Sequence, residues 1–119
     1  MRNNWLRGQN TSEYKLKGVI KEITSNSSNY DIRITGTTNC FAKFDNTEFN
    51  LLWDSLTKSV KAIELSQTYL VDIKNEVMIN LINVCYANSK PIEVFIEEDL
   101  TDSNNPKYTI KSITALSNI

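Results

Sequence analysis

The sequence predicts a small α+β domain that is mainly β-sheet and carries one long helix. Its 119 residues are enough for a single hydrophobic core and too few for two. Several segments alternate apolar and polar residues with a period of two, which is typical of strands with one buried face. One segment, residues 67–87, instead places apolar residues at every third or fourth position, which indicates a helix.

The first part of the chain favours three consecutive antiparallel strands. Residues 15–23, 30–35 and 40–44 alternate, and the polar turn sequences TSNSSN and TGTTN separate them. Gly18 lies inside the first of these strands and indicates a bend, as in a strand that turns the corner of a small barrel. We interpret residues 1–14, which precede the first strand, as an extended arm.

The middle of the chain combines two patterns. A short helix over about 46–56 is predicted because Asp45 and Glu48 have the spacing of a capping box and the apolar residues that follow recur at helical spacing. Residues 60–65 alternate as a strand would and also fit a helix, and we assign them to a strand. Whether 46–65 is helix, strand or both stays open.

The helix predicted over about 67–87 is the clearest element. One apolar stripe runs along it, formed by Tyr69, Leu70, Ile73, Val77, Leu81, Ile82 and Cys85. Asn88 is suited to a helix cap, and Pro91 prevents the helix from continuing because it lacks an amide hydrogen and restricts Lys90. After Pro91 the hydrophobic period changes to two, so a strand follows.

Two strands, residues 92–98 and 108–116, are predicted to close the chain. The order is therefore three strands, a helical segment and two strands, with residues 60–65 as a possible sixth strand. This is the chain order of the five-stranded OB barrel, in which a helix plugs one end of the barrel between the third and fourth strands. The alternative is an open α+β sandwich with one sheet and two helices.

Composition excludes several classes of function. The chain has no histidine, so it has no Ser-His-Asp or Cys-His constellation, and its three glycines form no phosphate-binding loop. The acidic run Glu97, Glu98, Asp99 and Asp102 is interpreted as a solvated hairpin. We predict that the protein is not an enzyme and binds no metal or cofactor. No apolar run is long enough to span a membrane.

Three stretches resemble the B subunits of pertussis-like AB5 toxins, of the subtilase and typhoid toxin type. They are NWLRGQNTSEY followed by GVIKEI, YDIRI followed by CFAKF, and LINVCYANSKPIEVFIEE. The resemblance implies an OB fold, a homopentamer, glycan binding and secretion, with Met1 placed before a mature form; without it, a cytoplasmic location is expected. Lys17 stands where that group has a sialic-acid-binding serine. Cys40 and Cys85 are interpreted as small buried residues, and their pairing stays open.

The candidate ligand-binding residues combine aromatic and basic side chains. They are Trp5, Tyr14, Lys17, Lys21, Arg33 and Lys43. Trp5 and Tyr14 are amphipathic aromatics placed on the predicted arm, where they could contact a glycan or a protein surface. The basic residues would also fit the alternative function, a cytoplasmic OB protein that binds single-stranded nucleic acid or a protein partner. The net charge of −1 counts against nucleic acid.

An uneven distribution of charge predicts the contact of a homo-oligomer. Residues 1–21 carry five basic side chains and one acidic one, whereas residues 91–105 carry five acidic side chains and no basic one. We therefore expect the basic first strand of one subunit to meet the acidic hairpin of the next. The residues expected at this contact are Lys15, Lys17, Glu93 and Glu97.

Overall fold

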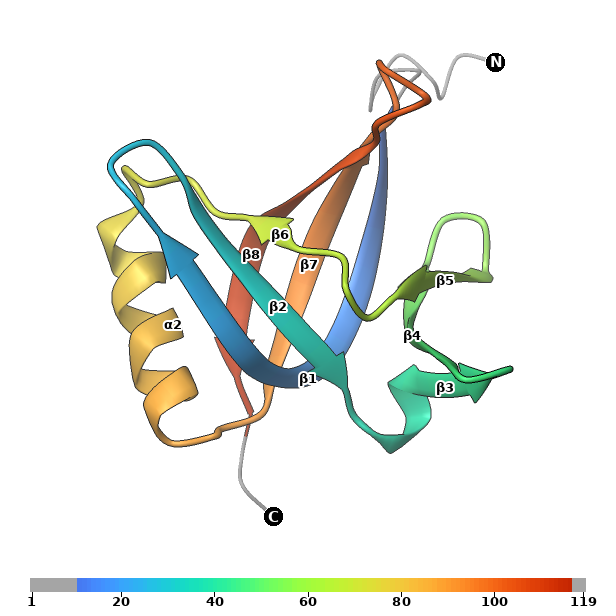
Figure 1. Cartoon of the computed structure of the whole chain (residues 1–119), viewed down its shortest axis with the longest axis horizontal. Helices are drawn as coiled ribbons and strands as arrows, with labels where there is room; N and C mark the ends of the chain where they lie inside the picture. Colours follow the sequence, from blue (N-terminus) through green and yellow to red (C-terminus); the bar gives the residue numbers. More distant parts are fainter. Residues whose placement is uncertain (1–10, 117–119) are drawn as a thin grey trace.

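The fold is given by a computed structural model that describes residues 11–116 (Figure 1). Most of this part of the chain is β-sheet, and one α-helix lies between the sixth and seventh strands. In chain order the elements are β1 Thr11–Ser25, β2 Tyr30–Gly36, the 3-10 turn η1 Thr38–Cys40, β3 Phe41–Phe44, β4 Thr47–Asp54, β5 Ser59–Glu64, β6 Tyr69–Leu70, α2 Glu76–Ala87, β7 Ile92–Asp99 and β8 Lys107–Ala115.

Five of the strands pair in a closed circuit, here called the ring. β1 is long enough to pair with β7 along its first half and with β2 along its second half, both antiparallel. β2 continues to the short β6, β6 pairs in parallel with β8, and β8 pairs antiparallel with β7. The order β1, β2, β6, β8, β7 therefore returns to β1.

Gly18 lies where β1 changes its partner. It is opposite Ile92 of β7 and also opposite Gly36 of β2. A Cβ atom at this position would lie 2.5 Å from the carbonyl oxygen of Thr35. The two strands therefore approach so closely that no larger residue fits without a shift of the backbone.

The helix α2 closes one end of the ring (Figure 1). Its inward face carries Met78, Ile82 and Cys85, which are buried in the core together with the inward residues of the ring strands. The side chain of Asn75 caps the first turn by accepting a hydrogen bond from the backbone N–H of Met78 at 3.1 Å. At the other end the backbone N–H of Lys90 donates to the Cys85 carbonyl, which ends the helix before β7.

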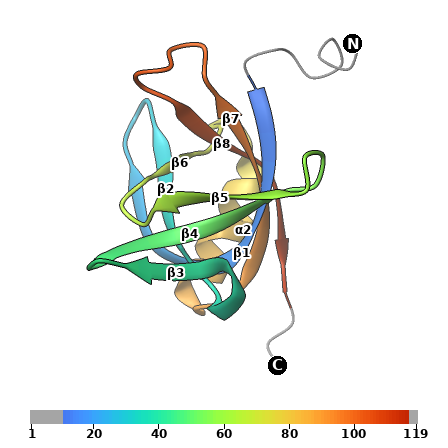
Figure 2. The ribbon, with the colours of Figure 1, turned by 90° about the vertical axis from the view of Figure 1, so that its right-hand side faces the viewer.

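A second sheet unit, β3, β4 and β5, lies at the opposite end and is called the meander (Figures 1 and 2). β4 is its central strand and pairs antiparallel with both β3 and β5. The inner face of the meander packs on the core through Leu52 and Ile63, which are 0% and 7% exposed. A single register pair, Lys15 with Trp53, joins β4 to β1 of the ring.

Most of the strands predicted from the alternation of residues are confirmed. The predicted ranges 15–23, 30–35, 40–44, 60–65, 92–98 and 108–116 correspond to β1, β2, β3, β5, β7 and β8. The first strand is longer than predicted, because residues 11–14 belong to β1 and not to an arm. Residues 1–10 of the predicted arm lie outside the described residues.

The helix predicted over 46–56 is wrong, because this segment is strand β4. Asp45 and Asn46 do not cap a helix; both have positive φ, 50° and 66°, and form the two-residue turn of a β-hairpin. The buried positions of β4 are Asn50, Leu52 and Asp54, which follow the period of two expected for a strand. Because Asn50 and Asp54 are polar, the apolar residues of this segment do not show the alternation expected of a strand.

The helix predicted over 67–87 is correct only from Glu76 onward. Tyr69 and Leu70 form β6, which completes the ring between β2 and β8. Tyr69 is fully buried, and its position in the apolar stripe therefore reflects burial in a strand and not helical spacing. The predicted third strand of the barrel, 40–44, belongs to the meander, and β6 takes the third position in the ring. The alternative with two helices does not fit, since α2 is the one α-helix of residues 11–116.

The structure also shows the state of the two cysteines and the character of the helices. Cys40 is partly buried and Cys85 is buried, and both thiols are free. Burial raises the pKa of the Cys85 thiol, which makes it unreactive at neutral pH. None of the helices in the described part of the chain is long and apolar enough to cross a membrane.

Candidate functional site

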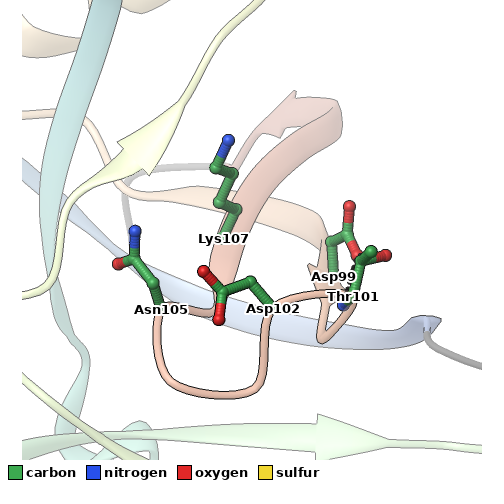
Figure 3. Close-up of a pocket in the computed structure, with 5 residues that line it drawn as sticks. All are labelled: Asp99, Thr101, Asp102, Asn105 and Lys107. Carbon is green, nitrogen blue, oxygen red and sulfur yellow. Dashed lines mark hydrogen bonds between the residues drawn. The ribbon is translucent and has the colours of Figure 1, made fainter.

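A polar depression lies beside the connection between β7 and β8. It has a volume of about 240 Å³, and the residues that line it, here called the rim, are Asp99, Thr101, Asp102, Asn105 and Lys107. Figure 3 shows Asp102, Asn105 and Lys107 on one side of the loop and Asp99 and Thr101 on the other. Carboxylate, hydroxyl, amide and ammonium groups therefore meet around one small space.

Local hydrogen bonds fix the shape of this loop. The carboxylate of Asp99 accepts from the backbone N–H of Thr101 at 2.9 Å and from its hydroxyl at 2.6 Å. These bonds stabilise the charged form and hold the pKa of Asp99 below its usual value. The Asp102 side chain accepts from the backbone N–H of Asn104, and the Asp102 carbonyl accepts from the N–H of Asn105. The loop is thus ordered by its own side chains.

A second depression adjoins the first one and shares Asn105 and Lys107 with it. Its volume is about 210 Å³, and it is lined by Gln67, Thr68, Leu70, Asn105, Pro106, Lys107 and Tyr108. This lining adds apolar surface from Leu70 and Pro106 to the polar groups of the rim. Lys107 belongs to no ion pair within residues 11–116, so its ammonium group is available to a ligand.

A buried carboxylate, Glu98, lies immediately before the rim. It is 1% exposed and accepts hydrogen bonds from the hydroxyls of Tyr14 at 3.3 Å and Tyr108 at 2.8 Å. It also forms an ion pair with Lys61 of the meander. Burial, and then Glu98, raises the pKa of both tyrosines, so both are neutral donors at neutral pH. The interpretation of Glu98 as part of a solvated hairpin is therefore wrong.

The alternation of residues in the sequence already indicates that Glu98 is buried. Ile92, Val94 and Ile96 are buried at alternate positions of β7, and Glu98 is the next member of the same series. A carboxylate in such a position needs partners, and here they come from β1, β5 and β8. Glu98 lines neither depression, so its network has a structural role and is not part of the rim.

The structure separates the predicted ligand-binding residues from one another. Tyr14 is 8% exposed and points into the ring, so it does not present a free aromatic surface. Arg33 forms an ion pair with Glu22 at 3.0 Å, which neutralises its charge. Trp5 lies outside the described residues.

The remaining candidates are exposed lysines at three different places. Lys17 and Lys21 lie on opposite sides of the point where β1 changes partner, and Lys43 lies on β3, opposite Glu48. None of the three joins the polar groups of the rim. The rim residues Thr101 and Asn105 were missed because they lie in a turn with no periodicity, and Lys107 was missed because it is the first residue of β8, one position before the predicted strand.

The residues predicted for a contact between subunits lie side by side within one chain. β1 pairs with β7 from Thr11 opposite Asp99 to Gly18 opposite Ile92, which places Lys17 directly opposite Glu93. Lys15 forms an ion pair with Glu93 at 3.9 Å. Glu97 lies opposite Glu13. The contrast between a basic first strand and an acidic hairpin is therefore largely balanced inside the chain.

Metal chemistry finds no support among the described residues. Within residues 11–116 no three side chains of the types His, Cys, Asp and Glu are grouped so that they could hold a metal ion.

Comparisons of the chain with models of known protein families, with characterised proteins and with solved structures found no match.

Proposed function

We propose that the protein is a non-enzymatic binding module of the OB type that recognises a glycan at the β7–β8 rim and works as a homo-oligomer. The OB part of the proposal is supported by the pairing of the ring strands. β1, β2, β6, β7 and β8 have the order and directions of a five-strand OB barrel, with α2 between the third and fourth of them. The meander is then an insertion between the second and third barrel strands.

The location of the rim is what carries the proposal. OB folds bind ligands on the face of strands two and three and at the loops that join strands one to two and four to five. In this chain the second of these loops is residues 100–106. Two adjoining depressions meet at this loop and share Asn105 and Lys107.

The mixture of groups at the rim suits a hydroxyl-rich ligand. Sugar hydroxyls both donate and accept hydrogen bonds, and the rim offers carboxylate acceptors, an ammonium donor and an amide that does both. The apolar surface of Leu70 and Pro106 suits the C–H face of a sugar ring. Oligomerisation would add avidity to such a shallow site.

Single-stranded nucleic acid fits this surface less well. Asp99 and Asp102 would repel a phosphate backbone at the loop. The charge of Arg33, on the strand where OB folds place basic residues, is already neutralised by Glu22. The structure therefore favours the neutral, hydroxyl-rich ligand.

A glycan array followed by titration of the best ligand tests the proposal. Lys107→Ala should weaken binding by about tenfold, because it removes a charged hydrogen-bond donor. Lys111→Ala is the matched control, since Lys111 is also an exposed lysine of β8 but does not line either depression. Absence of binding to every glycan, or an equal loss in both variants, would contradict the proposal.

A further inference from the structure

The outer face of the meander is an apolar sheet surface that the described fold leaves partly exposed. Residues directly opposite one another on antiparallel strands point to the same side. The register therefore defines this outer face as Ala42, Phe44, Thr47, Phe49, Leu51, Trp53, Val60, Ala62 and Glu64. All except Thr47 and Glu64 are apolar, whereas a solvated sheet face normally carries polar residues.

Several of these side chains are exposed far more than an ordinary core residue. Phe44 is 72% exposed and Val60 is 58% exposed. The opposite face of the same strands is buried, with Leu52 and Asn50 fully enclosed. The inner face is therefore mixed in character and buried, whereas the outer face is mainly apolar and ranges from half-buried at Leu51 and Trp53 to exposed at Phe44 and Val60.

The outer face continues across β1 onto β7. Trp53 is opposite Lys15, and Lys15 is opposite Phe95, which is 43% exposed. These three residues line one shallow depression of about 180 Å³, so they share one side of the molecule. The result is an apolar centre on three strands with a charged border on β1 and β7, which is the arrangement found at protein interfaces.

The size of this surface matches a protein partner. With strands about 4.8 Å apart and about 3.3 Å per residue, the four, eight and six residues of β3, β4 and β5 cover about 290 Å², and the eight paired residues each of β1 and β7 bring the area to about 540 Å². Stable complexes bury about 800 Å² on each partner. The outer face with its border therefore approaches the area that a weak to moderate dimer needs.

The two charges that border the apolar centre are complementary to each other. Glu64 of β5 lies opposite Phe49 of β4, and Lys15 of β1 lies opposite Trp53 near the other end of β4. A two-fold axis in the plane of contact, perpendicular to the line that joins these residues, places Glu64 of each copy over Lys15 of the other. The face is thus complementary to itself, as a two-fold interface requires.

We propose that two copies of this chain associate through the outer face of the meander. The inference makes the homo-oligomer of the proposed function specific, and it names a surface that glycan binding at the rim does not use. Phe44, Leu51, Trp53 and Val60 form the apolar centre of the contact. Glu64 and Lys15, which also pairs with Glu93 of its own chain at 3.9 Å, form its charged border and set the orientation of the two copies.

Sedimentation velocity of the full chain over about 5 to 500 µM tests the proposal, because an interface of this size dissociates within that range. The mass should rise with concentration from 13.6 kDa toward twice that value. Phe44→Ser should raise the dissociation constant by about tenfold or more. Val77→Ser is the matched control: Val77 is 81% exposed but lies on α2, at the other end of the ring, and its replacement should change nothing.

A charge exchange tests the orientation. Glu64→Lys and Lys15→Glu should each weaken association, since each creates two like-charge contacts per dimer, and the double variant should restore it. Circular dichroism of each variant shows whether it is folded. A protein that stays monomeric at all concentrations would overturn the proposal, and so would a dimer or a pentamer that Phe44→Ser and Glu64→Lys leave unchanged. Glycan binding by such a monomer would still support the rim, so the two proposals can fail separately.

Discussion

The two ends of the ring are closed in different ways. At one end α2 contributes an apolar face, with Ile82 and Cys85 fully buried. At the other end the meander buries polar groups as well, namely Asn50 and Asp54. A helix satisfies its own backbone hydrogen bonds, so an apolar face is enough to close an end, whereas strands that cross the end of a sheet leave backbone groups that need partners.

Asn50 shows how the meander end meets this need. Its side-chain carbonyl accepts from the N–H of Gly36 at 2.7 Å, and its amide donates to the carbonyl of Ile34 at 2.8 Å and to the hydroxyl of Tyr69 at 3.2 Å. The first two groups belong to the last residues of β2, where the pairing with β1 comes to its end. One buried side chain therefore completes the end of a strand.

The outer surfaces of the two ends also differ. The exposed side of α2 carries Val77, Val84 and Tyr86 among asparagines, whereas the outer face of the meander joins the exposed Phe44 and Val60 to half-buried apolar neighbours. At the α2 end the inner side packs on the core and the outer side is mixed in polarity, so this end does not require a further partner. At the meander end the inner face packs on the core, whereas Phe44 and Val60 of the outer face are exposed.

The largest effect is expected at the apolar end. Ile82→Ala should lower the free energy of unfolding by about 3 kcal/mol, because it removes a fully buried side chain and leaves a cavity. Val77→Ala, one and a half turns away on the exposed side of α2, should change it by less than about 0.5 kcal/mol. Urea unfolding of both variants measures this, and similar losses in the two would show that α2 does not plug the ring.

At the meander end the comparable change is Asn50→Leu. We expect a loss of about 2 kcal/mol, because the side chain stays large but becomes apolar, so the Gly36 N–H and the Ile34 carbonyl lose their partner in the interior. Asn80→Leu, at an exposed position of α2, serves as the control and should be nearly neutral. If Asn50→Leu left the free energy of unfolding unchanged, the hydrogen bonds of Asn50 would not be what stabilises this end.

The contact between meander and ring through Lys61 and Glu98 should contribute less. Lys61→Met leaves the buried carboxylate with its two tyrosines but without a countercharge, and should cost about 1 kcal/mol, since Lys61 itself is partly exposed to solvent. In a double-mutant cycle the pair Lys61→Met and Glu98→Gln should lose less than the sum of the single changes. Strict additivity would show that the two side chains do not interact.

The last effect is absent at neutral pH and is confined to alkaline solution. The pKa of Tyr108 is raised by burial and by Glu98, so its stabilisation is complete below the ordinary tyrosine pKa of about 10 and is lost as pH rises above it. Unfolding free energy should then fall by up to about 1.4 kcal/mol per pH unit above pH 10 for this group. Tyr108→Phe should flatten the dependence, and Tyr86→Phe, at an exposed position, should not.

The sequence indicated most strands but not how they connect. Alternation located β1, β2, β5, β7 and β8 because each has one apolar face and one polar face. It failed for β4, because its buried positions include the polar Asn50 and Asp54 and its half-buried positions include the apolar Phe49, Leu51 and Trp53. β6 has only two residues, too few for any period to be visible.

The candidate site was harder to predict than the fold. The rim is a loop whose residues act through their position between two strands, and that position follows from the closure of the ring. Tyr14 was expected at a surface because the start of β1 was placed four residues too late. Charge patterning did bring Lys15 and Glu93 together, but as neighbours within one chain.

The difference between the two ends is tested most directly by ¹H–¹⁵N spectra of the full chain recorded over a dilution series. We predict that resonances of the meander, above all the backbone of Leu51 and the indole of Trp53, shift with concentration, while those of α2 around Val77 and Val84 do not. Trp53→Phe identifies the indole signal. Shifts confined to α2, or no shift anywhere up to the highest concentration, would contradict the account of the meander as the open end of the molecule.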